Sequence, residues 1–189
     1  MGMSPAAERW TRDRVWALPE DGRRYELIDG ELVVTPAPRG VHQVAVLSLG
    51  VRIAVGLPNT GLHVLHSPAD ISLGEEEVLQ PDLFVYRTAN GRHLVSWDDI
   101  TALELVIEVS SPSTVRYDRQ LTRRRYQRAG VPEYWIVDLD ARLVERWRPE
   151  DARPEIVTSQ LKWSPPGGVP LVIELPAFFA ELWGDEEPR

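Results

Sequence analysis

The sequence contains no cysteine, which excludes disulfide bonds, cysteine nucleophiles and zinc sites built on thiolates. It also lacks any apolar run of the roughly 18 residues that a membrane-spanning helix needs. The first ten residues have no apolar core of the kind found in secretory signal peptides. We therefore expect a cytoplasmic protein that does not contact a membrane.

Lysine is nearly absent, because Lys162 is the only one among 21 basic residues. The formal net charge of -8 argues against a surface that binds nucleic acid over its whole area, since neutralising phosphates requires clustered Lys and Arg. Any contact with DNA must then be local. No G-x-S-x-G turn and no glycine-rich phosphate loop is present, which argues against a serine hydrolase and a nucleotide-binding protein.

The 189 residues are 43% hydrophobic and 26% charged, as is usual for a soluble globular domain. No repeat or linker-like stretch divides the chain. We expect one domain over residues 1–189, with its core at about residues 20–184.

A β-hairpin is predicted around Asp29-Gly30, a dipeptide that supplies the positive φ angles of a tight turn. Pairing Ile28 with Glu31 places Glu26, Ile28 and Glu31 on one face of the hairpin. Two carboxylates therefore share that face.

Residues from about 40 to 54 have helical periodicity. The pattern predicts a helix that buries one stripe against a sheet, formed by Val41, Val44, Leu47, Val51 and Val55.

Strand-like runs follow near His63, Asp82 and Glu108, and the last is apolar on both faces, as a central strand should be. A helix is predicted from about Asp118 to Ala129, ended by Gly130. Two further strands and a closing strand and helix complete an α/β (α+β) pattern.

Asp82 and Glu108 are the acidic residues of greatest interest. A carboxylate at the end of an apolar strand costs several kcal/mol of desolvation unless a cation or a hydrogen-bond donor meets it. Mg²⁺ prefers one or two carboxylates together with water and phosphate, which these two positions could supply. The alternative is that both acids pair with arginines.

Four blocks occur in order: "YELIDGEL", "QPDLFVY", "LELVIEVSSPST" and "YDRQLTRRRYQRAGVPEYWIVD". Together they resemble the Uma family of restriction-endonuclease-like proteins in the PD-(D/E)XK nuclease superfamily. The resemblance covers roughly residues 25–138. It implies a restriction-endonuclease-like mixed central sheet flanked by helices, in which Asp82 and Glu108 bind Mg²⁺ or Mn²⁺ for phosphodiester hydrolysis.

The resemblance also exposes a departure from the family pattern. The superfamily has a catalytic lysine two residues after the second acid, where this chain has Ser110. The family moves that lysine to the following helix, at the position of Thr122 here, and a hydroxyl cannot supply a positive charge. Arg123 is the nearest cation in sequence, and its guanidinium is a poor base.

His42 and Glu31 are further candidates for the site. His42 lies in the first turn of its predicted helix, where it could approach a phosphate, and the family commonly has a histidine there. Glu31 belongs to the recurring "DGE" block and is a stronger candidate than Glu26. A surface histidine and a solvated hairpin face are the alternatives.

The predicted helix after Pro112 is rich in arginine, and Arg119, Arg123 and Arg124 could follow a phosphate backbone. A solvated helix face is the alternative. The leading hypothesis is a metal-dependent nuclease acting on DNA. A second is a non-cleaving protein that binds nucleic acid, and a third is a homodimeric interaction protein whose interface uses the tryptophan-rich C-terminal half.

Overall fold

The computed structural model describes residues 9–19, 21, 23–35, 38–74, 77–89, 91, 94–110 and 118–183. Its first elements are α1 (Arg12–Trp16), β1 (Arg24–Ile28), β2 (Glu31–Thr35), α2 (Gly40–Val55), β3 (Leu62–His66), β4 (Ile71–Gly74), β5 (Glu77–Leu79), β6 (Leu83–Thr88), η1 (Trp97–Asp99) and β7 (Ile100–Ser110). After these come η2 (Asp118–Thr122), α4 (Arg123–Arg128), β8 (Tyr134–Asp138), β9 (Leu143–Trp147), β10 (Glu155–Val157), β11 (Gln160–Trp163), β12 (Leu171–Glu174) and α5 (Leu175–Trp183). Within these ranges no helix has the length and apolar character needed to cross a membrane.

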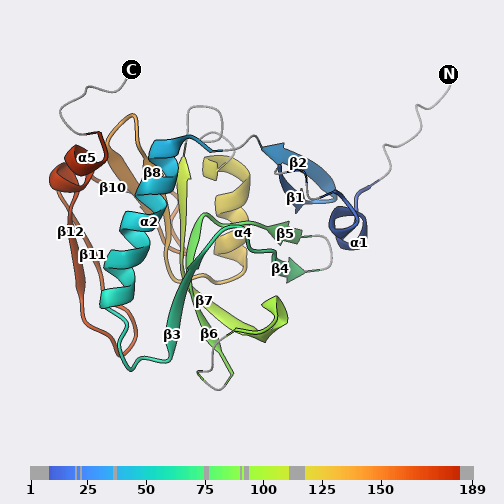
Figure 1. Ribbon diagram of the computed structural model, residues 1–189, viewed down its shortest axis with the longest axis horizontal. Coiled ribbons are helices and arrows are strands. Elements are labelled where there is room, and N and C mark those ends of the chain that lie inside the picture. Colours follow the sequence, from blue (N-terminus) through green and yellow to red (C-terminus); the bar gives the residue numbers. More distant parts are fainter. Residues whose placement is uncertain are drawn as a thin grey trace.

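A six-stranded sheet in the order β10-β9-β8-β7-β6-β3 forms the centre of the fold (Figure 1). β7 and β8 run parallel, whereas the other neighbours are antiparallel. Every residue of β7 from Leu105 to Ser110 is buried. Ile107 packs in the cluster that contains α2, and Val106 packs in the cluster that contains Tyr126 of α4. The expected mixed sheet flanked by helices is therefore confirmed.

The predicted hairpin is confirmed with its register. Ile28 pairs with Glu31, and Asp29 and Gly30 have φ angles of 54° and 78°. The hairpin is part of a second sheet, in the order β2-β1-β5-β4, which lies beside the central sheet (Figure 1). The chain leaves this small sheet after β5 and enters the central sheet at β6, so the segment around Asp82 lies between the two.

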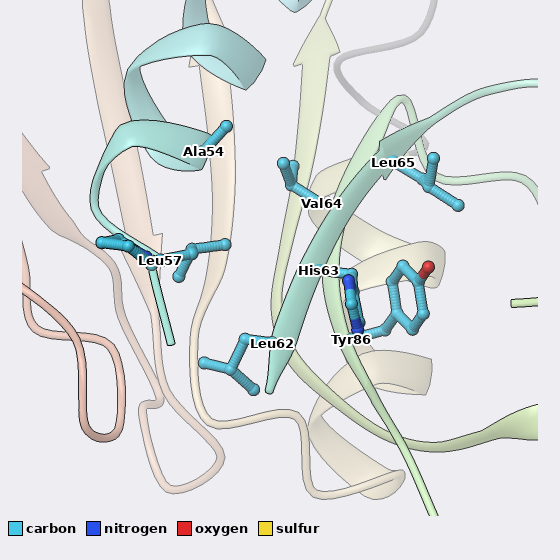
Figure 2. A pocket seen from close by; sticks show the side chains of 8 residues that line it. Ala54, Leu57, Leu62, His63, Val64, Leu65 and Tyr86 are labelled. Carbon is cyan, nitrogen blue, oxygen red and sulfur yellow. The ribbon is translucent and has the colours of Figure 1, made fainter. Parts of the chain in front are cut away.

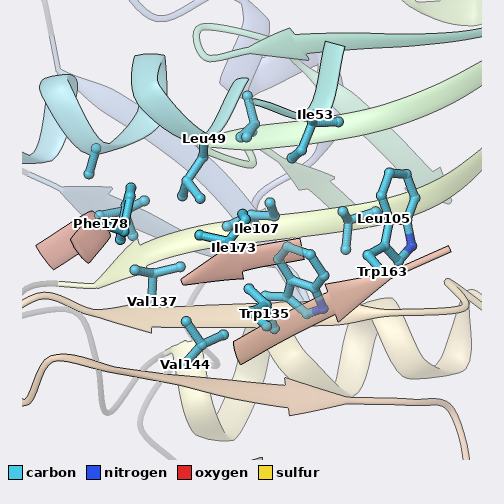
Figure 3. Packing of buried hydrophobic residues seen from close by; sticks show 14 of the residues in the cluster. Leu49, Ile53, Leu105, Ile107, Trp135, Val137, Val144, Trp163, Ile173 and Phe178 are labelled. Carbon is cyan, nitrogen blue, oxygen red and sulfur yellow. The ribbon is translucent and has the colours of Figure 1, made fainter. Parts of the chain in front are cut away.

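Helix α2 is present at the predicted place, but the predicted buried stripe is wrong. Val44, Leu47, Val51 and Val55 are exposed, and α2 instead buries Ala45, Val46, Leu49 and Ile53. Leu49 and Ile53 face Ile107 and Leu105 of β7 (Figure 3). The helix is apolar on nearly all sides, so spacing alone could not select the face that packs on the sheet.

The predicted helix over residues 118–129 begins differently from expectation. Residues 118–122 form a π-helical turn, η2, and regular α-helix begins only at Arg123. Gly130 ends the helix with a φ of 73°, as predicted. π-Helical turns inside helices are frequent at functional sites.

Three tryptophans of the C-terminal half are buried, whereas Trp183 is half-buried. Trp135, Trp147 and Trp163 are each less than 10% exposed. Trp135 and Trp163 meet edge to face, with ring centroids 6.3 Å apart. The three buried side chains therefore stabilise the core of the protein.

Candidate active site

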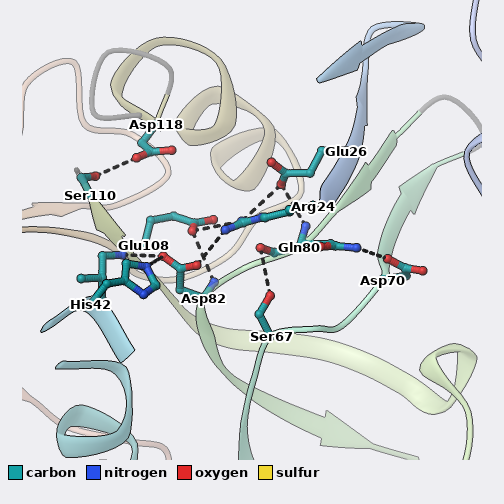
Figure 4. Close-up of polar contacts among 11 residues, drawn as sticks. Arg24, Glu26, His42, Ser67, Asp70, Gln80, Asp82, Glu108, Ser110 and Asp118 are labelled. Atoms are coloured by element: carbon teal, nitrogen blue, oxygen red, sulfur yellow. Dashed lines mark hydrogen bonds and ion pairs between the residues drawn. The ribbon is translucent and has the colours of Figure 1, made fainter. Parts of the chain in front are cut away.

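Asp82 and Glu108 converge at neighbouring strands. Leu83 of β6 pairs with Ile107 of β7, so the two acids occupy the next step along the same antiparallel pair. Both are buried, and the Asp82 backbone N–H donates to Glu108 Oε2 at 3.3 Å. Their carboxylates face the same guanidinium (Figure 4). The structure thus brings together the two acids that the sequence selected.

That guanidinium belongs to Arg24, a residue that the sequence analysis did not select. Arg24 Nη1 lies 2.7 Å from Asp82 Oδ1, and Nη2 lies 3.3 Å from Glu108 Oε2. Nη2 is also 3.4 Å from Glu26 Oε1, and Glu26 accepts a hydrogen bond from the Gln80 backbone N–H. Strand alternation places Arg24 and Glu26 on the face of β1 on which Ile28 is buried, but it does not show that this face meets Asp82 and Glu108.

Hydrogen bonds hold the Asp82 carboxylate in one orientation. His42 Nε2 from the first turn of α2 lies 3.0 Å from Asp82 Oδ2, and the Val109 backbone N–H donates to the same oxygen at 2.8 Å. Burial raises the pKa of Asp82, but the hydrogen bond from His42 and the charge of Arg24 outweigh it and lower the pKa. Asp82 is therefore a carboxylate that directs Oδ1 toward the cation.

The pKa values of the three other acids of the cluster are raised. Burial raises the pKa of Glu26, and it raises that of Glu108 well above the ordinary value, although Arg24 opposes both shifts. Asp118, which accepts a hydrogen bond from Ser110 Oγ at 2.7 Å, has a pKa raised by burial to about 6. Three acids contact one arginine and Asp118 adds a fourth carboxyl to the cluster, so the cluster attracts protons or another cation.

Several buried polar atoms of this region have no hydrogen-bond partner among the described residues. They are Glu108 Oε1, His42 Nδ1, Thr122 Oγ1, Tyr126 Oη and Tyr134 Oη. Buried polar groups are almost always satisfied by protein, water or an ion. The unpartnered carboxylate oxygen of Glu108 in particular is suited to a cation. Thr122, at the family's lysine position, is buried but contributes no charge.

The remaining candidates lie elsewhere. Glu31 is exposed, and Glu26, from the same hairpin face, is the acid that enters the cluster. Lys162 is exposed on β11, which belongs to a separate two-stranded sheet. The sole lysine of the chain is therefore not part of the acidic cluster.

The arginines of the helix are mostly engaged within the protein. Arg119 forms ion pairs with Glu145 and Asp138. Arg123 lies over the Trp147 ring, 4.2 Å from its centroid, and so turns away from the acids. Arg124 is exposed. Of the three predicted phosphate contacts, Arg124 alone has its side chain open to solvent in this way.

A separate shallow hollow lies near the C-terminal end of α2, at the end away from His42 (Figure 2). Leu57, Leu62 and Val64 contribute to its lining, with His63 and Tyr86 as its aromatic members. It contains no carboxylate, so it lacks the ligands and acid–base groups that the acidic cluster offers.

The residues of the acidic cluster fit a divalent ion in donor chemistry. Carboxylate oxygens are the ligands that Mg²⁺ and Mn²⁺ prefer, and two of them leave positions for water and phosphate. Within the described residues, no three Asp, Glu or His side chains form a metal cage by themselves. Asp82 and Glu108 could hold such an ion once the guanidinium of Arg24 leaves the oxygens that it contacts.

Comparison with known proteins agrees with this architecture. A family model described as "Uma2: Putative restriction endonuclease" matches residues 13–177. The chain belongs to the Uma2 family. This Uma2 protein has the same fold as a protein from Anabaena variabilis whose crystal structure is described as a "putative nuclease belonging to DUF820". The TM-score is 0.73 and the sequence identity is 20%. The similarity covers 91% of this chain and 98% of that one, and a search of curated proteins gave no match.

Proposed function

We propose that this Uma2 protein is a nuclease that hydrolyses DNA phosphodiester bonds with a divalent ion, Mg²⁺ or Mn²⁺, held by Asp82 and Glu108. The observation that carries the proposal is the convergence of these two buried carboxylates on a single cation at adjacent strand ends. Membership of a family described as restriction endonucleases supports the same reaction class.

Each residue of the cluster has a distinct part in this proposal. His42 and the Val109 N–H orient Asp82, and the unpartnered Oε1 of Glu108 offers a second ligand oxygen. When bound, the ion stabilises the negative charge that develops on the scissile phosphate. Glu26 accepts a hydrogen bond from the Gln80 N–H and so holds the backbone segment that leads into Asp82.

The reaction needs a group that removes a proton from the attacking water, and the family's lysine is absent. The Ser110 hydroxyl donates its hydrogen bond to Asp118, so its proton is not available to the attacking water. Thr122 cannot accept a proton at neutral pH in the way a neutral amine does. We therefore propose a slow enzyme, in which positioning and charge stabilisation contribute more than base catalysis.

The experiment compares the wild-type protein with Asp82→Asn on plasmid and linear DNA in Mn²⁺, with EDTA as the blank. We expect wild-type cleavage and a loss of about 100-fold or more in the variant, because its ligand loses its charge. Asp140→Asn, which changes an Asp of the Arg39 surface ion pair, is the matched control. Equal products from wild type and Asp82→Asn would refute the proposed centre.

A second candidate function is DNA binding without cleavage. It is favoured by the threonine at the lysine position and by the guanidinium that already occupies the space between the acids. Binding of this kind would persist in EDTA and weaken steeply with salt, because it depends on phosphate contacts. Metal-dependent cleavage by the wild type would exclude it as the sole function.

A further inference from the structure

Arg24 contacts every acid on its side of the cluster with one planar group. Its guanidinium spans Asp82 Oδ1, Glu108 Oε2 and Glu26 Oε1 at 2.7, 3.3 and 3.4 Å. These are contacts within reach of a fork of N–H donors, and one of the three oxygens, Asp82 Oδ1, is the Asp82 oxygen that the proposed divalent ion would use. The guanidinium of Arg24 therefore contacts the Asp82 oxygen that the ion would bind.

Arg24 also covers the acids from solvent. Its side chain is 24% exposed, whereas the side chains of Asp82 and Glu108 are 6% and 3% exposed. Arg24 is therefore the most exposed of these three side chains, although its Nε atom is buried. The other oxygen of Asp82 is no alternative ligand, because His42 and Val109 already engage it.

We infer that Arg24 is a resident counter-ion that competes with the divalent ion for Asp82 and Glu108. The inference rests on the proposed function, since it concerns the ion of that centre. In the metal-free protein the guanidinium neutralises the two carboxylates and keeps them together. The ion binds both carboxylates only in molecules in which the guanidinium of Arg24 has left Asp82 Oδ1, because Oδ2 is already engaged.

Competition of this kind lowers the apparent affinity for the ion in proportion to the fraction of molecules in which the guanidinium is away. If it is away in about one molecule in ten, the apparent affinity falls about tenfold. Arg24 is thus a positioning residue that sets how much metal the centre needs, in addition to any effect on the reaction itself.

The test measures Mn²⁺ binding by calorimetry at pH 8, together with the melting temperature in EDTA and in Mn²⁺. For Arg24→Gln we expect Mn²⁺ affinity about tenfold or more above wild type, because the competing charge is gone. We also expect a lower melting temperature in EDTA and a larger rise on adding Mn²⁺. The control is Arg87→Gln, which breaks the Arg87–Glu104 ion pair elsewhere on β6 and β7. This variant should have the same Mn²⁺ affinity as wild type.

Arg24→Lys provides a second variant in case Arg24→Gln does not fold. A single ammonium cannot span both carboxylates as the guanidinium fork does, so Mn²⁺ affinity should rise by a smaller factor. Affinity equal to or below wild type in whichever of the two variants folds would overturn the competition.

The outcomes also separate this inference from the proposed function. If wild type binds Mn²⁺, Asp82→Asn does not, and removing the guanidinium leaves affinity unchanged, the metal centre stands and the competition is refuted. If neither wild type nor the Arg24 variants bind Mn²⁺, both the centre and the competition are refuted.

Discussion

Replacing Asp118 with asparagine should stabilise the protein at neutral pH and have little effect in acid. Asp118 is buried, and its pKa is raised from the ordinary value of 3.8 to about 6, chiefly by burial. The substitution removes an ionisable group but keeps an oxygen that can accept the hydrogen bond from Ser110. It therefore isolates the effect of charge at this position.

The sign and size follow from linkage. Well below pH 3.8 the carboxyl is protonated in the folded and the unfolded chain, so ionisation makes no difference to stability. As the pH rises to about 6, the unfolded chain loses its proton first and stability falls. Above pH 6 the cost is constant at about 3 kcal/mol, since one pKa unit corresponds to 1.36 kcal/mol.

Urea unfolding in EDTA at pH 4 and pH 8 measures this difference. We expect Asp118→Asn to gain about 3 kcal/mol over wild type at pH 8, or about 6–12 °C in melting temperature, and close to nothing at pH 4. Asp98→Asn, at an exposed aspartate, is the control and should show no such dependence. A gain that is equal at both pH values would refute the assignment of a raised pKa to Asp118.

Two further predictions concern catalysis and DNA contact. Thr122→Lys places an ammonium at the position of the family's lysine, so we expect Mn²⁺-dependent DNA cleavage to rise about 10–100-fold, whereas Thr122→Met, of similar length but uncharged, should give no increase in a plasmid-nicking assay. Arg124→Glu with Arg128→Glu, at two exposed positions of α4, should weaken DNA binding and reduce the slope of log affinity against log salt by about 2. The slope is measured by fluorescence anisotropy, and an unchanged slope relative to the exposed control Arg153→Glu would contradict a role for α4 in DNA contact.

Local sequence patterns predicted much of the fold. The Asp29-Gly30 turn determined the hairpin register, and the apolar run before Glu108 identified the central strand. The same local reasoning placed Asp82 and Glu108 at strand ends, where pairing of β6 with β7 brings them together. These features depend on short-range backbone geometry, which a single sequence displays directly.

The parts that failed depend on contacts between distant segments. Nothing within α2 distinguishes Leu49 from Leu47, because only the docking of the helix on β7 decides which of them is buried. Arg24 and Glu26 enter the site because β1 lies in a sheet that meets the central one. Sequence spacing likewise could not show that Arg123 would stack on Trp147.

The acidic cluster combines Glu108 of the central sheet and the adjoining Asp82 with Arg24 and Glu26 of the neighbouring sheet, so the docking of the hairpin and the ionisation of these acids are linked. Conditions that protonate Glu108 weaken the attraction that holds β1 in place. Conversely, any fluctuation that lifts β1 away leaves two carboxylates facing each other without a counter-charge. Docking of the N-terminal hairpin and protonation of the acids are therefore thermodynamically linked. A mutation that weakens docking changes the pKa values of the acids, and a change in their protonation changes the stability of docking.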